Sequence, residues 1–472
     1  MKPFLISLLS ILLSICVYSG EVSKTPLPEW IRPVEFVDQN ILDDHFGYQY
    51  LLLERQHNLI KETSFNHFAV KVLNSQGVQN LSDIRVDYDP SYQSLRFHTM
   101  RIFRNGEVIE KLDGCIINEY QRETNMDRYI YDGSHTAVVN LADVRKNDII
   151  EYSYSIMGRN PLYKGQYSGS FFQQLQIPVN RIYYKLIVPG DMELKFKTFN
   201  GAYNARAVKK NSHMEYTWDV EALDYVIYDD NTPSWYNNQR RIDVSSFKTW
   251  GDFVEWAMPF YSVNEPDVKK LGENFDKSRP DRKVILDMIQ TVQDNIRYLG
   301  FESGMRAHIP NPPTTVYSQR YGDCKDKSLL LVAMLRSLGI DAFPVLVNTT
   351  EGCVLNEKLP GYTVFDHCVV FFIYKGMEIY VDPTISYQGG QLGNIYFPDY
   401  NYGLHIREGS NCLKRIEQND NPRIEITENI DVGSVGGSAN IKITSKYYGS
   451  QADEMRYYFN YQTREAIERD YL

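Results

Sequence analysis

Cysteine is scarce in this sequence, and its spacing is not that of a metal site. The 472 residues include six cysteines, and no two of them are separated by only two residues. Structural zinc sites usually draw on cysteines at that short spacing, so we expect none. One cysteine, Cys16, lies in an N-terminal apolar segment, which leaves five. In an oxidising compartment four of these could form disulfides, in pairs that the sequence leaves open, and at least one thiol stays free.

The sequence also lacks an excess of positive charge. Lysine and arginine number 50 against 60 aspartates and glutamates, a formal net charge of −10, and no basic stripe stands out. Nucleic acid is therefore not an expected partner. There is no calcium-binding pattern and no cofactor motif, so the sequence predicts neither a metal nor a cofactor. Hydrophobic residues at 43% and charged residues at 23% are ordinary for a soluble globular protein.

Long apolar runs are absent beyond the N-terminus, so no membrane span is expected in the mature chain. Lys2 precedes an apolar run over residues 4–17, and Ser19 suits the position just before a signal-peptidase cut. This pattern predicts a signal peptide over residues 1–19 and export to the periplasm, the cell envelope or the medium. A lipoprotein anchored through Cys16 is the weaker alternative, because a large residue precedes that cysteine where a small one is needed.

Tyrosine is abundant. The 36 tyrosines, with many threonines, valines and isoleucines, favour β-sheet. Between residues 65 and 227, short β-rich runs alternate with turn signals, and Asn105-Gly106 between two such runs is a strong hairpin signal. Their spacing is typical of a sandwich, so we predict an N-terminal β-sandwich domain over residues 20–240. The histidines of this region each stand alone and are interpreted as structural.

Helical patterns begin near residue 245. Thr249 and Asp252 have the spacing of a capping box. A second helix is predicted to start near Pro280, to bury one apolar stripe and to end at Gly300. A third segment, residues 328–338, is apolar on nearly every side, which is typical of a helix that is buried all round.

A cysteine lies just ahead of this apolar helix, in the stretch RYGDCKDKSLLL. At a helix N-terminus the free N–H groups and the macrodipole favour a thiolate. An isolated cysteine is often only a small buried hydrophobe, but charged neighbours such as Asp323 and Lys325 argue against that interpretation of Cys324. The run after the helix contains Pro344, which predicts an edge strand or a bulged one.

A histidine and an aspartate follow on what reads as a hairpin. Two β-rich runs flank Lys375-Gly376, so a two-residue turn is expected there. Counting outward from this turn sets His367 opposite Thr384 and places Asp382 on the same face, at the diagonal position. A register slip of one residue would send the two side chains to opposite faces.

Cys324, His367 and Asp382 are the residue types of a thiol acyl-transfer site. The thiolate attacks an acyl carbonyl, the imidazole transfers the proton, and the carboxylate fixes the imidazole tautomer. His308 is a rival base, but it lies on an apparent loop without a carboxylate partner. Cys368 points to the face opposite His367 and is expected in the core.

The sequence from about Trp250 to Leu404 resembles a bacterial transglutaminase-like core of the papain-like cysteine superfamily. The segments that carry the resemblance are, in order, YGDCKDKSLLLVAMLRSLGIDAFPVLV, FDHCVVFF and YVDPT. NIRYLGFESG and NPPTTVYSQRYGDCKDKS are similar to the subgroup found in bacterial envelope proteins. The resemblance implies that Cys324 is the nucleophile, His367 the general base and Asp382 its orienting partner. Members are described as transglutaminases or as cysteine peptidases.

The resemblance also implies a domain order. In that subgroup a β-rich domain of uncharacterised function precedes the core and a second β domain follows it. We therefore predict an α+β protein with four segments: the signal peptide (1–19), the β-sandwich (20–240), the catalytic core (241–410) and an apparently incomplete C-terminal β domain (411–472).

Two classes of function fit these observations. The first is an exported enzyme that hydrolyses or transamidates a peptide or isopeptide bond, with a peptide or protein as substrate. The second is a non-catalytic envelope binding protein that keeps the fold as a scaffold. The enzyme is favoured, because a scaffold gains nothing from three polar groups held together in one apolar site. The backbone N–H of Cys324 is a candidate oxyanion donor, and Tyr298 is a further one.

Overall fold

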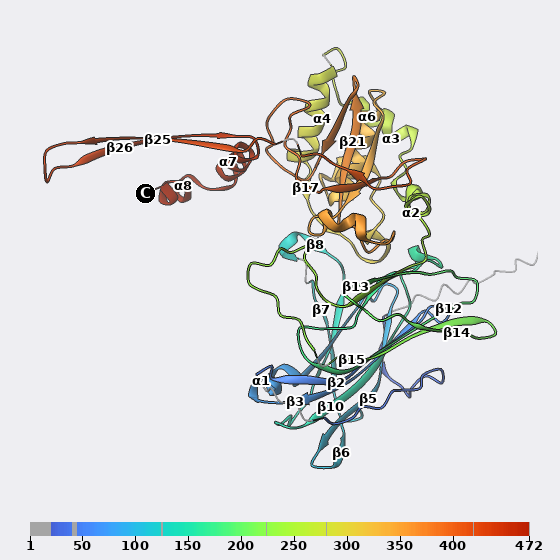
Figure 1. Cartoon of the computed structure of the whole chain (residues 1–472). Helices are drawn as coiled ribbons and strands as arrows, with labels where there is room; N and C mark the ends of the chain where they lie inside the picture. Colours follow the sequence, from blue (N-terminus) through green and yellow to red (C-terminus); the bar gives the residue numbers. More distant parts are fainter. Residues whose placement is uncertain are drawn as a thin grey trace, which may run out of the picture.

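The structure of the protein is a computed structural model that describes residues 20–39, 45–123, 126–222, 224–279, 281–418 and 420–471. The predicted signal peptide and Pro280 lie outside these residues. The chain forms an N-terminal β domain, a mixed α+β core and a C-terminal arm, residues 423–471, that projects from the core (Figure 1). Within the ranges just given, no helix combines the length and apolar character that crossing a bilayer requires.

The N-terminal domain is built on a nine-stranded sheet. Its path runs β1–β5–β10–β3–β2–β12–β15–β14, with β6 beside β5. Two three-stranded sheets, β4–β9–β7 and β11–β16–β13, pack on this sheet, and Tyr152 and Tyr154 contact the apolar core under both. The predicted sandwich is confirmed. The elements are β1 (Val22–Lys24), β2 (Tyr48–Asn58), β3 (Thr63–Val72), α1 (Ser75–Leu81), β4 (Asp83–Tyr88), β5 (Ser94–Arg104), β6 (Glu107–Glu110), β7 (Ile117–Gln121), β8 (Ile130–Tyr131), β9 (His135–Asn140), β10 (Ile149–Met157), β11 (Ser168–Phe172), β12 (Val179–Pro189), β13 (Lys195–Phe199), β14 (Arg206–Lys209), β15 (His213–Ala222) and β16 (Arg241–Ser245).

The core is a five-stranded antiparallel sheet, β22–β21–β20–β23–β24, covered by helices. Helix α6 packs on β20 and β21, and α3, α4 and α5 contact α6. The elements are α2 (Trp250–Ala257), α3 (Glu265–Gly272), α4 (Asp281–Asn295), β17 (Arg297–Tyr298), β18 (Gly300–Phe301), α5 (Pro313–Gln319), β19 (Tyr321–Gly322), α6 (Cys324–Arg336), β20 (Ala342–Val347), β21 (His367–Tyr374), β22 (Met377–Val381), β23 (Tyr402–His405) and β24 (Lys414–Arg415).

Helix α6 is the buried centre of the core. Every residue from Lys325 to Leu335 is buried, as the apolar pattern predicts. The capping box that the sequence predicts at Thr249 is also present, because Thr249 accepts from the Asp252 backbone and Asp252 accepts from the Thr249 backbone. Local sequence signals therefore predict the burial of α6 and the start of α2 correctly.

Two predictions about the core are wrong. Strand β20 is an interior strand, paired with β21 on one side and β23 on the other. Pro344 is tolerated there because its nitrogen faces the end of the β23 ladder, where the Ile406 N–H donates to the Pro344 carbonyl (2.9 Å) and Pro344, which has no N–H, returns no bond. Gly300 does not end helix α4, which stops at Asn295. The residues between them form β17 and β18, two short strands that pair with distant parts of the chain.

The C-terminal arm begins with the hairpin of β25 (Arg423–Val432) and β26 (Ala439–Tyr448), which extends away from the core (Figure 1). Two helices follow, α7 (Ser450–Tyr461) and α8 (Arg464–Tyr471). The sequence predicts a β domain in this region, and the hairpin is its β structure, followed by the two helices.

Candidate active site

Cys324 is the first residue of helix α6. Asp323 caps the helix, and its carboxylate accepts from the backbone N–H of Lys325 (3.0 Å) and of Asp326 (3.1 Å). The preceding residue, Gly322, lies so close to Asp326 that an added Cβ would come within 2.6 Å of the Asp326 Cβ. The thiol is therefore held at a helix N-terminus, where negative charge is stabilised, by a turn that only glycine fits.

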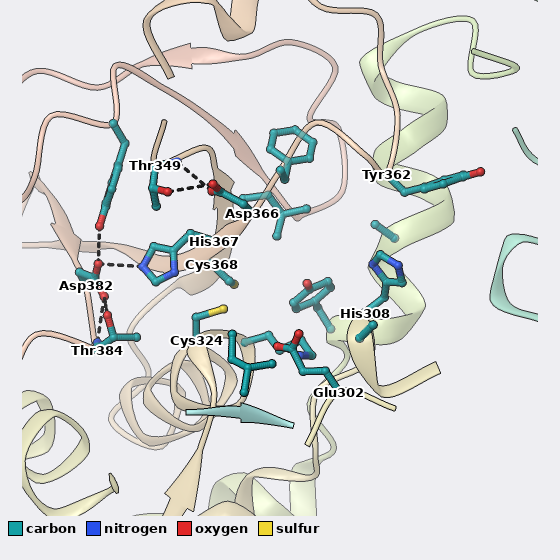
Figure 2. A pocket seen from close by; sticks show the side chains of 18 of the residues that line it. Glu302, His308, Cys324, Thr349, Tyr362, Asp366, His367, Cys368, Asp382 and Thr384 are labelled. Atoms are coloured by element: carbon teal, nitrogen blue, oxygen red, sulfur yellow. Dashed lines mark hydrogen bonds and ion pairs between the residues drawn. The ribbon is translucent and has the colours of Figure 1, made fainter. Parts of the chain in front are cut away.

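His367 and Asp382 come from the two strands of one hairpin. The turn at Lys375-Gly376 pairs Tyr374 with Met377, which is the predicted register. His367 is the first residue of β21 and Asp382 follows the end of β22, and the His367 Nε2 lies 2.8 Å from the Asp382 Oδ2. Figure 2 shows the imidazole between the Cys324 sulfur and the Asp382 carboxylate. The structure thus brings the three predicted residues together.

The Asp382 carboxylate is buried and fully hydrogen-bonded. Its Oδ1 accepts from the backbone N–H (2.8 Å) and the hydroxyl (2.6 Å) of Thr384, and its Oδ2 also accepts from the Tyr400 hydroxyl at 2.6 Å. Burial raises the pKa of Asp382, but the charge of His367 and these hydrogen bonds outweigh it and lower the pKa to about 2. Asp382 is therefore ionised, and Tyr400 is a partner that sequence patterns did not reveal.

His367 is held as a cation. Burial lowers its pKa, whereas the charge and hydrogen bond of Asp382 and the hydrogen bond to Cys324 raise the pKa well above the ordinary histidine value. A protonated imidazole beside a thiol stabilises the thiolate. The structure therefore places a cationic imidazole beside the Cys324 thiol.

These residues open into a cavity of about 980 Å³. Asp366, just before His367, also lines it, and its carboxylate accepts from the backbone N–H and the hydroxyl of Thr349, each at 2.8 Å. Much of the remaining lining is aromatic: Phe253, Trp256, Phe260, Tyr261, Tyr362 and Phe365. The cavity is large enough for a ligand with several side chains.

A buried charge cluster lies beside the thiol. The Lys325 ammonium bonds the Asp323 carboxylate (2.5 Å) and the Glu302 carboxylate (3.1 Å). Burial lowers the pKa of Lys325, but these two negative charges raise it above its ordinary value. Burial also raises the pKa of Glu302, and the charge of Lys325 opposes that rise. The sequence did not reveal Glu302, because it lies 22 residues before Cys324 on another element.

His308, Cys368 and Tyr298 are the other candidate residues that the sequence brought forward. His308 lines the cavity and its Nε2 lies 2.9 Å from the Tyr163 hydroxyl. Burial and the charge of Lys325 lower the pKa of His308 to about 4, so it is neutral. Cys368 is buried in the core as predicted, but it also lines the cavity. Tyr298 lines the cavity, and burial together with the charge of Cys324 raises its pKa, so its hydroxyl stays protonated.

The disulfides that an exported protein could form are not present. In the described part of the chain, Cys115, Cys324, Cys353, Cys368 and Cys412 are all free. Among the residues that the structure describes, no group of three or more histidine, cysteine, aspartate or glutamate side chains could hold a metal ion.

Two known protein families match parts of the chain. Residues 269–357 match the transglutaminase-like superfamily, and residues 61–227 match DUF3857, a domain of unknown function with a solved structure. Part of the core thus matches the transglutaminase-like superfamily, with a DUF3857 match ahead of it, and at the level of the family this supports a cysteine-type enzyme.

The fold is shared with a solved structure. A "putative protease" from Parabacteroides distasonis ATCC 8503 superposes with a TM-score of 0.65 at 14% identity, over 79% of this chain and 72% of that one. A "putative cysteine protease" from Cytophaga hutchinsonii aligns over 82% of this chain and 89% of that one, at 10% identity and a TM-score of 0.22. Among curated proteins, none is significantly similar to the chain.

Proposed function

We propose that the protein is a cysteine acyl-transfer enzyme that acts on amide bonds of peptides or proteins. The Cys324 thiolate attacks the carbonyl carbon and forms a C–S bond, and the oxyanion collapses to expel the amine. The His367 imidazolium donates its proton to that amine. Water or a second amine then attacks the thioester while His367 accepts its proton, and Cys324 leaves as the thiolate.

One observation carries this proposal: the imidazole of His367 lies between the Cys324 sulfur and an ionised, fully hydrogen-bonded carboxylate, inside a cavity (Figure 2). Asp382 keeps the ring oriented, because its Oδ2 holds Nε2 and leaves the other nitrogen toward the thiol. Tyr298 and the backbone N–H of Cys324 are the proposed oxyanion donors. Both hydrolysis and transamidation follow from this chemistry, and they differ only in the second nucleophile.

We also propose that the protein is exported and that residues 1–19 are removed as a signal peptide. The support is the pattern of Lys2, the apolar run and Ser19. Intact-mass measurement on protein expressed with its natural N-terminus tests this. A mature chain that starts near Gly20 is expected, and one that retains residues 1–19 or carries a lipid on Cys16 contradicts it.

Alkylation by iodoacetamide tests the catalytic proposal without a substrate. Labelling is measured between pH 5.5 and pH 9 and located by mass spectrometry, with the exposed Cys412 as an internal reference thiol. Because alkylation follows the thiolate fraction, Cys324 is expected to react at least about tenfold faster than Cys412 at pH 6. His367→Ala should remove most of this advantage, and Asp382→Asn should reduce it less, because the imidazole remains.

His405→Ala is the matched control. His405 lies on β23 of the same sheet, 2.9 Å from the Tyr380 hydroxyl, and it does not line the cavity. Its loss should leave the ratio of Cys324 to Cys412 labelling near the wild-type value. If Cys324 reacts only in step with Cys412, with no response to His367→Ala, the protein is the non-catalytic scaffold.

A further inference from the structure

The chain between α4 and α5 is hydrogen-bonded to both domains. We call residues 297–311 the connecting segment. Its first strand, β17, pairs with β19, the strand that leads into Cys324, and the Leu299 N–H donates to the Gly322 carbonyl at 3.1 Å. Its second strand, β18, pairs with β8 of the N-terminal domain. The same few residues therefore hydrogen-bond to the nucleophile's strand and to the other domain.

The bonds to the N-terminal domain continue along the segment. The backbone N–H groups of Gly300 and Glu302 donate to the carbonyls of Tyr129 (2.9 Å) and Tyr131 (2.8 Å). Gly304 is then held at both of its backbone groups. Its N–H donates to the Asp89 carboxylate and its carbonyl accepts from the Asn160 amide, each at 3.0 Å.

The far end of the segment is fixed on both sides as well. The Tyr163 hydroxyl meets His308 Nε2 at 2.9 Å, and the Tyr163 ring stacks on Tyr362 with 3.9 Å between centroids. On the core side, Asn311 donates its backbone N–H (2.6 Å) and its amide (3.1 Å) to the Asp326 carboxylate of the α6 capping box.

The connecting segment forms one wall of the cavity. Tyr298, Glu302 and His308 all line it, and Tyr129 and Ile130 of the N-terminal domain line it directly. Tyr129 is 48% exposed, so its ring is available to a ligand. Trp256 and Phe260 of the core line the same cavity, so both domains contribute to its lining.

We infer that the N-terminal domain is a substrate-binding part of the active site: Tyr129 and Ile130 contact an apolar residue of a peptide substrate that touches both domains, and Tyr163 positions His308 and Tyr362 for the same ligand. This rests on the proposed function. A substrate confined to its reacting residue would meet only the core. A peptide with an apolar flanking residue gains contact with the N-terminal domain, which assigns a role to that domain.

The test compares two electrophiles on the full-length protein. The first is a random hexapeptide mixture with a central dehydroalanine, which reacts with thiols and carries residues on both sides of the reactive carbon. The second is iodoacetamide, which is too small to contact both domains at once. The measured quantity is the ratio of their rate constants at Cys324, so a change in the thiol itself cancels.

Tyr129→Ala is expected to lower this ratio about fivefold to tenfold, the loss of one aromatic contact. Tyr203→Ala is the matched control, because Tyr203 is another exposed tyrosine of the N-terminal domain (58%) that does not line the cavity. Peptides recovered on Cys324 should be enriched in apolar flanking residues, and Tyr129→Ala should reduce that enrichment.

Tyr163→Phe tests the positioning role, since it removes only the hydroxyl that meets His308. The peptide concentration for half-maximal labelling should rise about threefold or more, while the maximal labelling rate changes little. Tyr184→Phe is its control, because it removes a tyrosine hydroxyl that bonds the Phe172 carbonyl inside the N-terminal domain. A purely structural role would move both quantities alike in the two variants.

The outcomes separate the two proposals. If Cys324 reacts with iodoacetamide as expected but Tyr129→Ala and Tyr203→Ala give equal ratios, the inference about the N-terminal domain is overturned and the catalytic proposal stands. If neither reagent distinguishes Cys324 from Cys412, both fail. A ratio lowered by Tyr129→Ala alone supports both.

Discussion

A buried histidine in the N-terminal domain predicts how that domain responds to pH. His67 on β3 is 4% exposed and lies between two carboxylates, 2.7 Å from Glu54 on β2 and 3.0 Å from Glu151 on β10. Burial lowers the pKa of His67, but the hydrogen bonds and charges of Glu151 and Glu54 outweigh it and raise the pKa from 6.5 to about 9. Other groups at this cluster are Gln56, which donates to Glu54 at 2.6 Å, and Arg101, 3.5 Å from Glu151.

The size of the effect follows from the shift. Each pKa unit corresponds to about 1.4 kcal/mol, so the protonated histidine contributes about 3 kcal/mol to the free energy of unfolding. Because the folded-state pKa lies above the unfolded-state value, this stability is fully present below pH 6.5. It is lost as the pH rises through about 9. The sheet should therefore weaken on the alkaline side.

Hydrogen exchange of the β3 and β10 amides in urea measures this stability for the N-terminal domain alone. The difference in free energy of unfolding between the wild type and His67→Gln should shrink by about 3 kcal/mol from pH 6 to pH 10. Glu151→Gln keeps the histidine but removes one partner, so its loss of stability should be smaller and should occur at lower pH. A wild-type advantage over His67→Gln that stays constant from pH 6 to pH 10 would refute the reasoning.

Two further predictions concern the active site. Tyr400→Phe removes a hydrogen bond to Asp382 and should raise the folded-state pKa of that carboxylate from about 2. The stability that the carboxylate supplies above pH 3.8 is then lost at a higher pH than in the wild type. Acid titration followed by near-ultraviolet circular dichroism measures this shift. Gly322→Ala would press a Cβ against Asp326 at 2.6 Å, so we expect a loss of about 1–3 kcal/mol in thermal or urea unfolding and slower iodoacetamide labelling of Cys324.

Each of these has a control in the chain. Tyr184→Phe removes a buried hydroxyl that bonds a backbone carbonyl, and it should not move the acid midpoint as Tyr400→Phe does. Gly114→Ala meets no atom within 4 Å and should leave stability near the wild-type value. An acid midpoint that is the same in Tyr400→Phe and the wild type, or a Gly322→Ala variant as stable as Gly114→Ala, contradicts the respective prediction.

The parts of the site that local rules determine could be predicted from the sequence. A two-residue turn at Lys375-Gly376 fixes the register of its hairpin, and that register alone places His367 and Asp382 on one face. The helix start at Cys324 follows likewise from the apolar run behind it. Turn geometry and helix periodicity act over a few residues, so a single sequence carries them.

Long-range contacts could not be predicted in this way. Tyr400 reaches Asp382 from a loop 18 residues later, and Glu302 reaches Lys325 from 23 residues before it. Pro344 misled the prediction for the same reason. The destabilisation that a proline causes in a sheet depends on which adjacent strand its nitrogen faces and on where that strand ends. The residue pattern of a single strand does not contain this information.

The connecting segment has a consequence for the order in which the protein is made. N-terminal domains generally fold first as a chain leaves the ribosome, so β8 is synthesised long before residues 297–311 emerge to pair with it. Strand β19 and the thiol that follows it are made only afterwards, so the partner strand β17 leaves the ribosome before them. The N-terminal domain is thus synthesised first, the connecting segment next and Cys324 last. A nascent chain therefore has no assembled thiol site until its N-terminal domain has been synthesised.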